Sequence, residues 1–275
     1  MKNKILIFGK GFIGTRIHET LGGEITEKLI QCYKDAELEI RKFNPEILIN
    51  AIGYTGKHNV DDCEKDIDGT LLSNTFVPIY LAEVCLRNKI KFVHISSGCI
   101  YDFDYNNPAP ITEEDPPKYW KLFYSRTKIY SEQALLNFCK DLNFLILRIR
   151  IPLDNRHHPK NILSKLLKYK ERIIDVPNSI TYIPDFLEAL KHLIKIDARG
   201  LFNVVNDGAL KYSELLDVYK KFVPDFNYKI IELKDLKLTR TNLILSVDKL
   251  KKTGFPIRDI HEVLEECVKG FLNYS

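Results

Sequence analysis

The feature that most constrains the fold of this chain is a glycine motif, GKGFIG at residues 9–14, close to the N-terminus. It directly follows the short apolar run Ile5 to Phe8, which is typical of a central strand covered on both faces of a parallel sheet. Where such a strand turns into a helix, Gly9 permits the tight turn and Gly11 lets the backbone approach a pyrophosphate. Gly14 then lets the helix pack closely on the strand. The motif therefore predicts a βαβ unit that binds a dinucleotide.

Helices and strands are expected to alternate along the first half of the chain. The helix that follows the glycine motif is predicted to end near residue 21, with further helices at 34–42, 71–87 and 124–139 and strands at 46–52, 91–96 and 144–151. Pro78 is expected to kink the helix at 71–87. This alternation predicts an α/β protein with a Rossmann-type, doubly wound parallel sheet.

After about Pro152 the predicted elements become shorter. They are helices at 161–170, 185–194, 212–222 and 260–272 and strands at 172–176 and 201–205, with Asp185 as a helix N-cap. We expect residues 1–152, with 180–206 returning to them, to form the NAD(P)-binding domain. Residues 153–179 and 207–275 are expected to form a smaller C-terminal substrate-binding lobe at the carboxyl edge of the sheet, where open α/β folds bind ligands.

Composition excludes several classes of protein. The 275 residues carry 41 basic and 37 acidic side chains, an excess too small to indicate nucleic-acid binding, although a basic pocket for a phosphorylated ligand would account for it. The six cysteines are scattered without metal-ligand spacing, which indicates a reducing compartment and no metal site. No apolar run approaches the roughly 20 residues that span a bilayer, and no signal-peptide cleavage site follows the first strand. A cytoplasmic protein without a membrane partner is therefore expected.

Tyr124 and Lys128 lie four residues apart in the segment FYSRTK, so on a helix they share one face. The lysine ammonium would favour the phenolate and lower the tyrosine pKa from its usual value of about 10. A tyrosine of this kind can donate a proton to a carbonyl oxygen while a hydride arrives at the carbon. The same spacing also occurs by chance on solvated helix faces. Together with the glycine motif, however, the pair predicts a nicotinamide-dependent reductase.

Two further segments bear on this chemistry. Ser97 follows the predicted strand 91–96 and could donate a hydrogen bond to the same carbonyl oxygen, or it could satisfy the backbone of the local turn. An acidic residue about 20 positions after the glycine motif ordinarily binds the cofactor ribose. Glu24 and Glu27 are the candidates here, while Lys28 or Arg16 could meet a 2′-phosphate. The sequence does not choose between these arrangements. NADPH is expected from the reducing role, with NADH as the alternative.

With these motifs in place, the chain resembles the extended short-chain dehydrogenase/reductase superfamily, and more narrowly the dTDP-4-dehydrorhamnose reductase family. Within it, the chain is most similar to the bifunctional nucleotide-rhamnose synthase branch, the UDP-4-keto-6-deoxyglucose 3,5-epimerase/4-reductases of plants and some viruses. The segments that carry the resemblance are NAIGYTGKHNVDDCE (50–64), SGCIYDFD, FYSRTK, LRIRIP (147–152), HPKNILSKLLKY (158–169), VPNSIT (176–181) and GLFNVVNDG (200–208).

The resemblance implies that Ser97, Tyr124 and Lys128 form the reductase triad and that Cys99 and Lys165 form an acid/base pair for epimerisation. A 4-keto sugar has acidic protons at C3 and C5, because each carbanion delocalises onto the carbonyl oxygen. Inversion needs one group to remove a proton and another to return one on the opposite face, which a thiol and a lysine whose pKa is lowered by burial can do near neutrality. Taken alone, Cys99 would be a buried apolar residue and Lys165 a solvated charge.

The remaining site residues follow from position and from the resemblance. The cofactor is expected to contact the glycine motif with Phe12 and Ile13, the triad residues Tyr124 and Lys128, and, beyond these, Asn50, Ala51, Gly53 and Arg150. The substrate is expected to contact Asn74, Asn161, Asn178 and Thr181. Arg148 and Arg150 alternate on one strand, where they could bind phosphate or form structural ion pairs.

The resemblance thus implies an NADPH-dependent 3,5-epimerase/4-reductase that converts an NDP-4-keto-6-deoxy-D-glucose to the NDP-L-rhamnose, as a homodimer. The nucleotide of the sugar substrate (UDP, dTDP or GDP) stays open, because the loop at 102–118 is shorter than in the plant proteins. A plain 4-reductase and a non-catalytic NADP-binding regulatory subunit are the alternatives.

Overall fold

The computed structural model describes residues 4–104, 106, 108–138, 143–232, 235 and 241–274. The chain forms two compact units. The first comprises Met1–Ile100, Pro117–Arg148 and Lys195–Phe202, and the second comprises Tyr101–Pro116, Ile149–Ile194 and Asn203–Ser275. Of the segment 180–206 that was predicted to return to the first domain, only 195–202 does so, and the loop at 101–116 belongs to the second unit.

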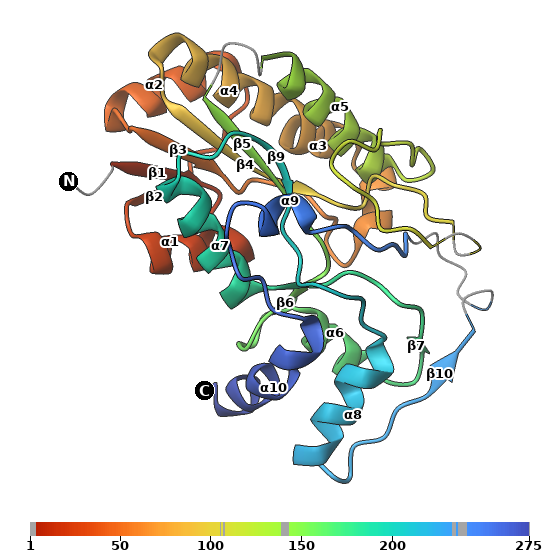
Figure 1. The fold of residues 1–275 in the computed structure, drawn as a ribbon. Coiled ribbons are helices and arrows are strands. Elements are labelled where there is room, and N and C mark those ends of the chain that lie inside the picture. The colour runs from red at the N-terminus through yellow and green to blue at the C-terminus, as the bar shows by residue number, and fades with distance from the viewer. Residues whose placement is uncertain are drawn as a thin grey trace. The chain divides into compact units, whose positions relative to one another are not determined.

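A six-stranded sheet in the order β2-β1-β3-β4-β5-β9 forms the centre of the first unit (Figure 1). Its strands are β1 (Ile5–Phe8), β2 (Glu24–Thr26), β3 (Ile47–Asn50), β4 (Lys91–Ser97), β5 (Phe144–Ile149) and β9 (Gly200–Asn203). β1 pairs in parallel with both β2 and β3, and β3 pairs in parallel with β4. The predicted α/β fold with a parallel sheet is therefore confirmed. The short edge strand β2 was not predicted.

Helices cover both faces of this sheet (Figure 1). They are α1 (Phe12–Leu21), α2 (Tyr33–Phe43), α3 (Ile67–Leu71), a π-helical turn (Leu72–Phe76), α4 (Val77–Asn88) and α5 (Phe123–Phe138), with a 3₁₀ turn at Val60–Lys65. α4 packs between α2 and α5, whereas α1 lies on the opposite face. Buried side chains of α2, α4 and the strands form one apolar core. The predicted helix end at residue 139 lies outside the described residues.

The helical run from Ile67 to Asn88 differs from the prediction of one helix kinked at Pro78. Three segments follow one another without a break, and a π-helical turn directly precedes Pro78. Pro78 lies in the first turn of α4, where the missing N–H of a proline removes no hydrogen bond of that α-helix. The run of 22 residues is also apolar enough to cross a membrane by length and composition alone, contrary to the expectation that no such stretch exists. Half of its most apolar window is buried inside the protein, and α4 contacts β3 and β4, as a core helix does.

The second unit consists of shorter elements. They are β6 (Pro152–Leu153), β7 (Ile173–Ile174), β8 (Thr181–Tyr182), β10 (Ile230–Ile231), α6 (Ile162–Lys168), α7 (Ile183–Lys195), α8 (Tyr212–Phe222), α9 (Asp248–Lys251), a 3₁₀ turn (Ile260–Val263) and α10 (Leu264–Asn273). β6 pairs with β8 and β7 with β10, both in parallel. A core of α6, α8 and α10 side chains packs around Tyr182. The prediction of Asp185 as an N-cap is wrong, because α7 begins at Ile183 and the Asp185 carboxylate pairs with Arg258.

Candidate active site

The glycine turn brings the ends of β1 and β3 together. The Ala51 N–H donates to the Phe8 carbonyl at 2.9 Å. Gly9 has a φ of +97°, and a Cβ at this position would lie 2.9 Å from the Ala51 carbonyl carbon. A Cβ on Gly14 would lie 1.8 Å from the Gly9 carbonyl oxygen. Both glycines are therefore required by the close approach of the two strands and α1, at the point where an open α/β sheet binds its ligand.

Packing within the protein does not require a glycine at position 11. A Cβ on Gly11 would meet no atom within 4 Å. Gly11 is also the N-cap of α1, where no side chain caps the helix and no acidic residue occupies the first turn. A helix N-terminus directly after such a turn suits the phosphates of a dinucleotide. These residues fit an NAD(P) cofactor.

Substitution of Gly14 with alanine tests this packing. The new Cβ would overlap the Gly9 carbonyl, so the turn must shift and the free energy of unfolding should fall by about 1–3 kcal/mol. The affinity for NADP⁺, measured by calorimetry, should fall with it. Gly11→Ala is the matched control, because its Cβ has open space and should leave the unfolding midpoint nearly unchanged. An unchanged midpoint for Gly14→Ala would contradict the packing argument.

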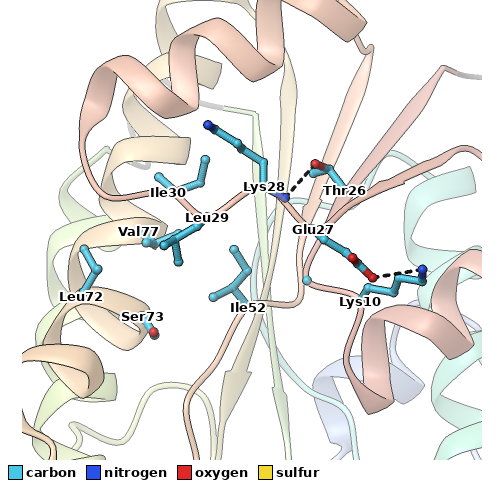
Figure 2. Close-up of a pocket in the computed structure, with 11 residues that line it drawn as sticks. Lys10, Thr26, Glu27, Lys28, Leu29, Ile30, Ile52, Leu72, Ser73 and Val77 are labelled. Carbon is cyan, nitrogen blue, oxygen red and sulfur yellow. Dashed lines mark hydrogen bonds and ion pairs between the residues drawn. The ribbon is translucent and has the colours of Figure 1, made fainter.

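A pocket of about 290 Å³ lies beside the turn (Figure 2). Its lining is Gly9, Lys10, Thr26, Glu27, Lys28, Leu29, Ile30, Ile52, Leu72, Ser73 and Val77. Leu29, Ile52 and Val77 form an apolar wall on one side in Figure 2. On the other side Lys10 Nζ pairs with Glu27 Oε1 at 3.0 Å. An apolar slot with a charged rim beside the glycine turn fits the adenosine half of a dinucleotide.

Tyr124 and Lys128 lie one turn apart on α5, and both side chains are buried. A Cβ on Gly53, in the loop after β3, would lie only 3.6 Å from Lys128 Nζ. The ammonium of Lys128 therefore lies close to the loop after β3, at the carboxyl edge of the sheet. Burial lowers the pKa of Lys128 to about 8, against the opposing effect of nearby negative charge, chiefly that of Glu132.

The end of β4 holds Cys99 beside this pair. Ser97 Oγ accepts the N–H of Cys99 at 3.1 Å, and Ser125 Oγ donates to the Cys99 carbonyl at 2.5 Å. Cys99 is half-buried and packs against the cluster that contains Tyr124, and its charge also affects the pKa of Lys128. The structure therefore gathers Ser97, Cys99, Tyr124 and Lys128, four of the five predicted catalytic residues. Because Ser97 Oγ accepts the backbone bond, its proton is left to donate to a substrate oxygen.

A buried ion pair joins α5 to β5. Arg148 on β5 binds the carboxylate of Glu132 on α5, with Nε to Oε2 at 3.0 Å, and Ser96 Oγ donates to the same carboxylate at 3.2 Å. Both charged side chains are almost fully buried. Of the two predicted uses of Arg148, the structural ion pair is confirmed. Glu132 was not predicted, although it follows Lys128 by one helical turn, the spacing that could have indicated it.

Asn50 and Asn74 position the loop after β3. Asn50 Oδ1 accepts the Ile52 N–H at 3.0 Å, and its Nδ2 lies 3.1 Å from His94 Nδ1. Burial, and secondarily the charge of Lys128, lower the pKa of His94 well below its usual value. Asn74 is fully buried and binds both the N–H and the carbonyl of Tyr54, at 2.8 and 2.9 Å. It fixes the backbone beside Gly53, and its contact with substrate stays a prediction.

The pH dependence of the reaction should follow the protonation of Lys128. Its pKa of about 8 means that the ammonium predominates below pH 8 and is lost as the pH rises through that value. Without this cation Tyr124 becomes a weaker acid, so kcat/KM should fall above about pH 8. The measurement is the pH profile of NADPH oxidation, with Lys128→Arg as the variant that removes this alkaline limb. A profile that stays flat between about pH 7 and 9 would contradict the assignment.

The second unit contains the other predicted residues in two groups. Arg150 binds Asn178 Oδ1 through Nη2 at 3.0 Å and also contacts Thr241. Thr181 Oγ1 accepts the Arg150 N–H at 2.9 Å and donates to the Val204 carbonyl at 2.9 Å. Arg150, Asn178 and Thr181 thus form one buried network within this unit. Their predicted contacts with cofactor and substrate stay predictions.

The other group surrounds the start of α6. Asn161 caps the helix by accepting the Leu163 N–H at 3.1 Å, and its Nδ2 binds the Asp154 carbonyl at 2.8 Å. Lys165 follows one turn later and is half-buried. Burial first, then the charges of Lys160 and Lys165, lower the pKa of His158. The catalytic role of Lys165 and the substrate contact of Asn161 stay predictions.

Comparisons with known proteins identify relatives of this chain. The family model described as the RmlD substrate binding domain matches residues 3–178. A bifunctional dTDP-4-dehydrorhamnose 3,5-epimerase/dTDP-4-dehydrorhamnose reductase of Arabidopsis thaliana is 30% identical over 96% of this chain and 91% of its own length. A trifunctional UDP-glucose 4,6-dehydratase/UDP-4-keto-6-deoxy-D-glucose 3,5-epimerase/UDP-4-keto-L-rhamnose-reductase of the same plant is 32% identical over 96% of this chain. The chain spans only 42% of the length of that relative.

Solved structures show the same fold. The L780 UDP-rhamnose synthase of Acanthamoeba polyphaga mimivirus superposes with a TM-score of 0.88 and 27% identity, covering 98% of this chain and 100% of that one. A dTDP-4-dehydrorhamnose reductase of Bacillus anthracis, crystallised with NADP, has a TM-score of 0.81 and 21% identity, with 97% of both chains covered.

Proposed function

We propose that this chain, which belongs to the family of the RmlD substrate binding domain, reduces nucleotide-linked 4-keto-6-deoxy sugars with NADPH and also epimerises them. The product would be an NDP-L-rhamnose. The named relatives include reductases of this kind and proteins that combine the reductase with a 3,5-epimerase. The confirmed parallel sheet and the open glycine turn support a dinucleotide site. A homodimer is part of the proposal.

For reduction, Tyr124 is the proton donor to the C4 oxygen. Ser97 donates a second hydrogen bond to that oxygen, and Lys128 keeps the phenol acidic. NADPH, when held at the glycine turn, would supply the hydride for C4. Burial of Tyr124 and Lys128 keeps water away and strengthens the effect of the ammonium on the hydroxyl.

For epimerisation, Cys99 and Lys165 exchange the protons at C3 and C5. One removes the proton, the electron pair moves onto the C4 oxygen as an enolate, and the other returns a proton on the opposite face. Ser97 and Tyr124 stabilise the enolate oxygen. The observation that carries this proposal is the position of Cys99. The hydroxyls of Ser97 and Ser125 bind its backbone N–H and carbonyl, and Cys99 packs against the cluster that contains Tyr124. Contacts of substrate with Asn74, Asn161, Asn178 and Thr181 belong to the same proposal.

The experiment is an incubation of the pure protein with NADPH and the UDP- or dTDP-linked 4-keto-6-deoxyglucose, without a separate epimerase. NMR of the product should show the rhamnose nucleotide. A C4-reduced sugar without inversion would leave a monofunctional reductase. No NADPH oxidation with either sugar nucleotide would favour the non-catalytic NADP-binding subunit. Comparison of the two sugar nucleotides under the same conditions gives the nucleotide preference.

A further inference from the structure

We propose that Glu132 is a positioning residue for reduction, whose buried carboxylate keeps the Lys128 ammonium charged and thereby extends the reaction to higher pH. This inference rests on the proposed function in that Lys128 is taken to act on Tyr124. It concerns a residue that touches neither sugar nor cofactor in the proposed mechanism. The Glu132–Arg148 ion pair thus serves catalysis in addition to joining α5 to β5.

Glu132 and Lys128 share one face of α5. They lie four residues apart, a spacing at which the Cβ atoms of a helix are about 5–6 Å apart. Their side chains are buried, with relative exposures of 0% for Glu132 and 3% for Lys128. In the part of the chain that the structure describes, no ion pair joins the Lys128 ammonium to a carboxylate. Glu132 therefore attracts Lys128 through space, and burial strengthens this attraction because little water screens it.

The carboxylate of Glu132 is held by other partners. Arg148 donates to Oε2 through Nε at 3.0 Å and to Oε1 through Nη2, and Ser96 Oγ donates to Oε2 at 3.2 Å. Hydrogen bonds from a cation and a hydroxyl stabilise the negative charge in a buried position. They also direct the carboxylate toward Arg148 rather than Lys128, so the ammonium stays available to Tyr124.

The other titratable groups around Lys128 come from several elements. They are His94 on β4, Cys63 in the 3₁₀ turn at Val60–Lys65, Cys99 after β4, Tyr124 on α5 and, bound to Glu132, Arg148 on β5. Burial raises the pKa of Cys63, and burial with the charge of Lys128 lowers that of His94, so both are neutral where Lys128 titrates. Among the described residues, the charge of Glu132 opposes the effect of burial on the pKa of Lys128 more than any other.

The test is the titration of Lys128 itself, followed by NMR of protein with ¹³C-labelled lysines, without sugar or cofactor. The Lys128 signal is identified by its absence in Lys128→Arg, and its midpoint in the unchanged protein should lie at about 8. Glu132→Gln removes the charge but keeps the shape. It should lower the midpoint by about one pH unit, the effect of one buried charge at this spacing. The alkaline limb of kcat/KM for NADPH oxidation should move down with it.

A second variant guards against a folding defect. Glu132→Gln leaves Arg148 buried without its carboxylate, which is strongly destabilising, whereas Glu132→Gln/Arg148→Met removes both charges and is better tolerated. The double variant should also lower the midpoint, but by less, because a buried cation has been removed as well. Glu83→Gln is the control. It makes the same charge change on α4, where the partly exposed Glu83 pairs with Arg87, and should leave the midpoint unaltered.

A midpoint that stays within about 0.3 pH units of the original in both Glu132 variants would overturn this inference, and so would a lowered midpoint with an unmoved kcat/KM limb. The proposed function would be intact in either case. A lowered midpoint in a protein that turns over no 4-keto sugar nucleotide would overturn the proposed function alone. Thermal unfolding of each variant measures the loss of packing separately, and a purely structural ion pair would lower the unfolding midpoint without moving the Lys128 titration.

Discussion

Replacing Tyr124 with phenylalanine is expected to lower kcat for NADPH-dependent reduction by about 10³-fold, the contribution of a well-placed general acid. The substitution removes only the hydroxyl. The ring would keep its buried packing against Cys63 and Phe123, so the unfolding midpoint and the affinity for NADP⁺ should stay close to those of the unchanged protein. The measurement is single-turnover NADPH oxidation with the sugar nucleotide in excess.

Tyr130→Phe is the matched control for this substitution. Tyr130 lies on the same helix, but its side chain is exposed. Loss of its hydroxyl should leave kcat within about twofold, since a group remote from the reacting atoms contributes little to catalysis. If Tyr124→Phe retained a tenth or more of the activity, Tyr124 would not be the proton donor.

Replacing Cys99 with serine is expected to suppress the exchange of the C3 and C5 protons with solvent by about 10²-fold or more. A serine hydroxyl is close to the thiol in size but is a far weaker acid, so it does not trade protons near neutrality. The bonds from Ser97 and Ser125 involve only the backbone of residue 99 and should persist. Mass spectrometry of sugar incubated in deuterated water, with NADP⁺ in place of NADPH, measures the exchange.

This variant separates the two proposed activities. Reduction of a substrate that already has the inverted configuration should survive in Cys99→Ser, because that step uses Ser97, Tyr124 and Lys128. Cys32→Ser is the control, since Cys32 is exposed at the start of α2. Full deuterium incorporation in Cys99→Ser would remove Cys99 from the mechanism, while loss of exchange together with loss of NADP⁺ binding would indicate a folding defect.

The parts of the fold that sequence predicts well are those set by local pattern. The apolar run at Ile5–Phe8 and the glycines after it determine a strand and a turn by themselves, and the structure places both as expected. The predicted helix at 212–222 coincides with α8. The family resemblance, based on motifs spread over the chain, is confirmed as well.

The parts that sequence misses are determined by contacts distant along the chain. β2 is only three residues long and contains Glu24 and Thr26, so it has no apolar pattern of its own and is defined by pairing with β1. The loop at 101–116 joins the second unit because Ile111 forms a β-bridge with Leu245. The Ile111 N–H donates to the Ile244 carbonyl, and the Ile111 carbonyl accepts the Ser246 N–H. No local signal in the loop indicates that pairing.

The candidate site shows the same division. Tyr124 and Lys128 could be found because their spacing is a property of one helix. The hydrogen bonds to the backbone of Cys99 come from Ser97 on β4 and Ser125 on α5. The Lys10–Glu27 ion pair joins the glycine turn to the end of β2. Sequence could name some of these residues but not the hydrogen bonds between them.

The buried Glu132–Arg148 pair has a consequence for how this protein can change over time. It fixes α5 against β5, and the same helix carries Ser125 and Lys128 within the two turns before Glu132. One inserted or deleted residue in that stretch would rotate everything beyond it by about 100°, and either the anchor or the lysine would face the wrong way. We therefore expect length variation among descendants to spare this segment and to fall in the surrounding loops, leaving single-residue exchange as the route by which the helix diverges.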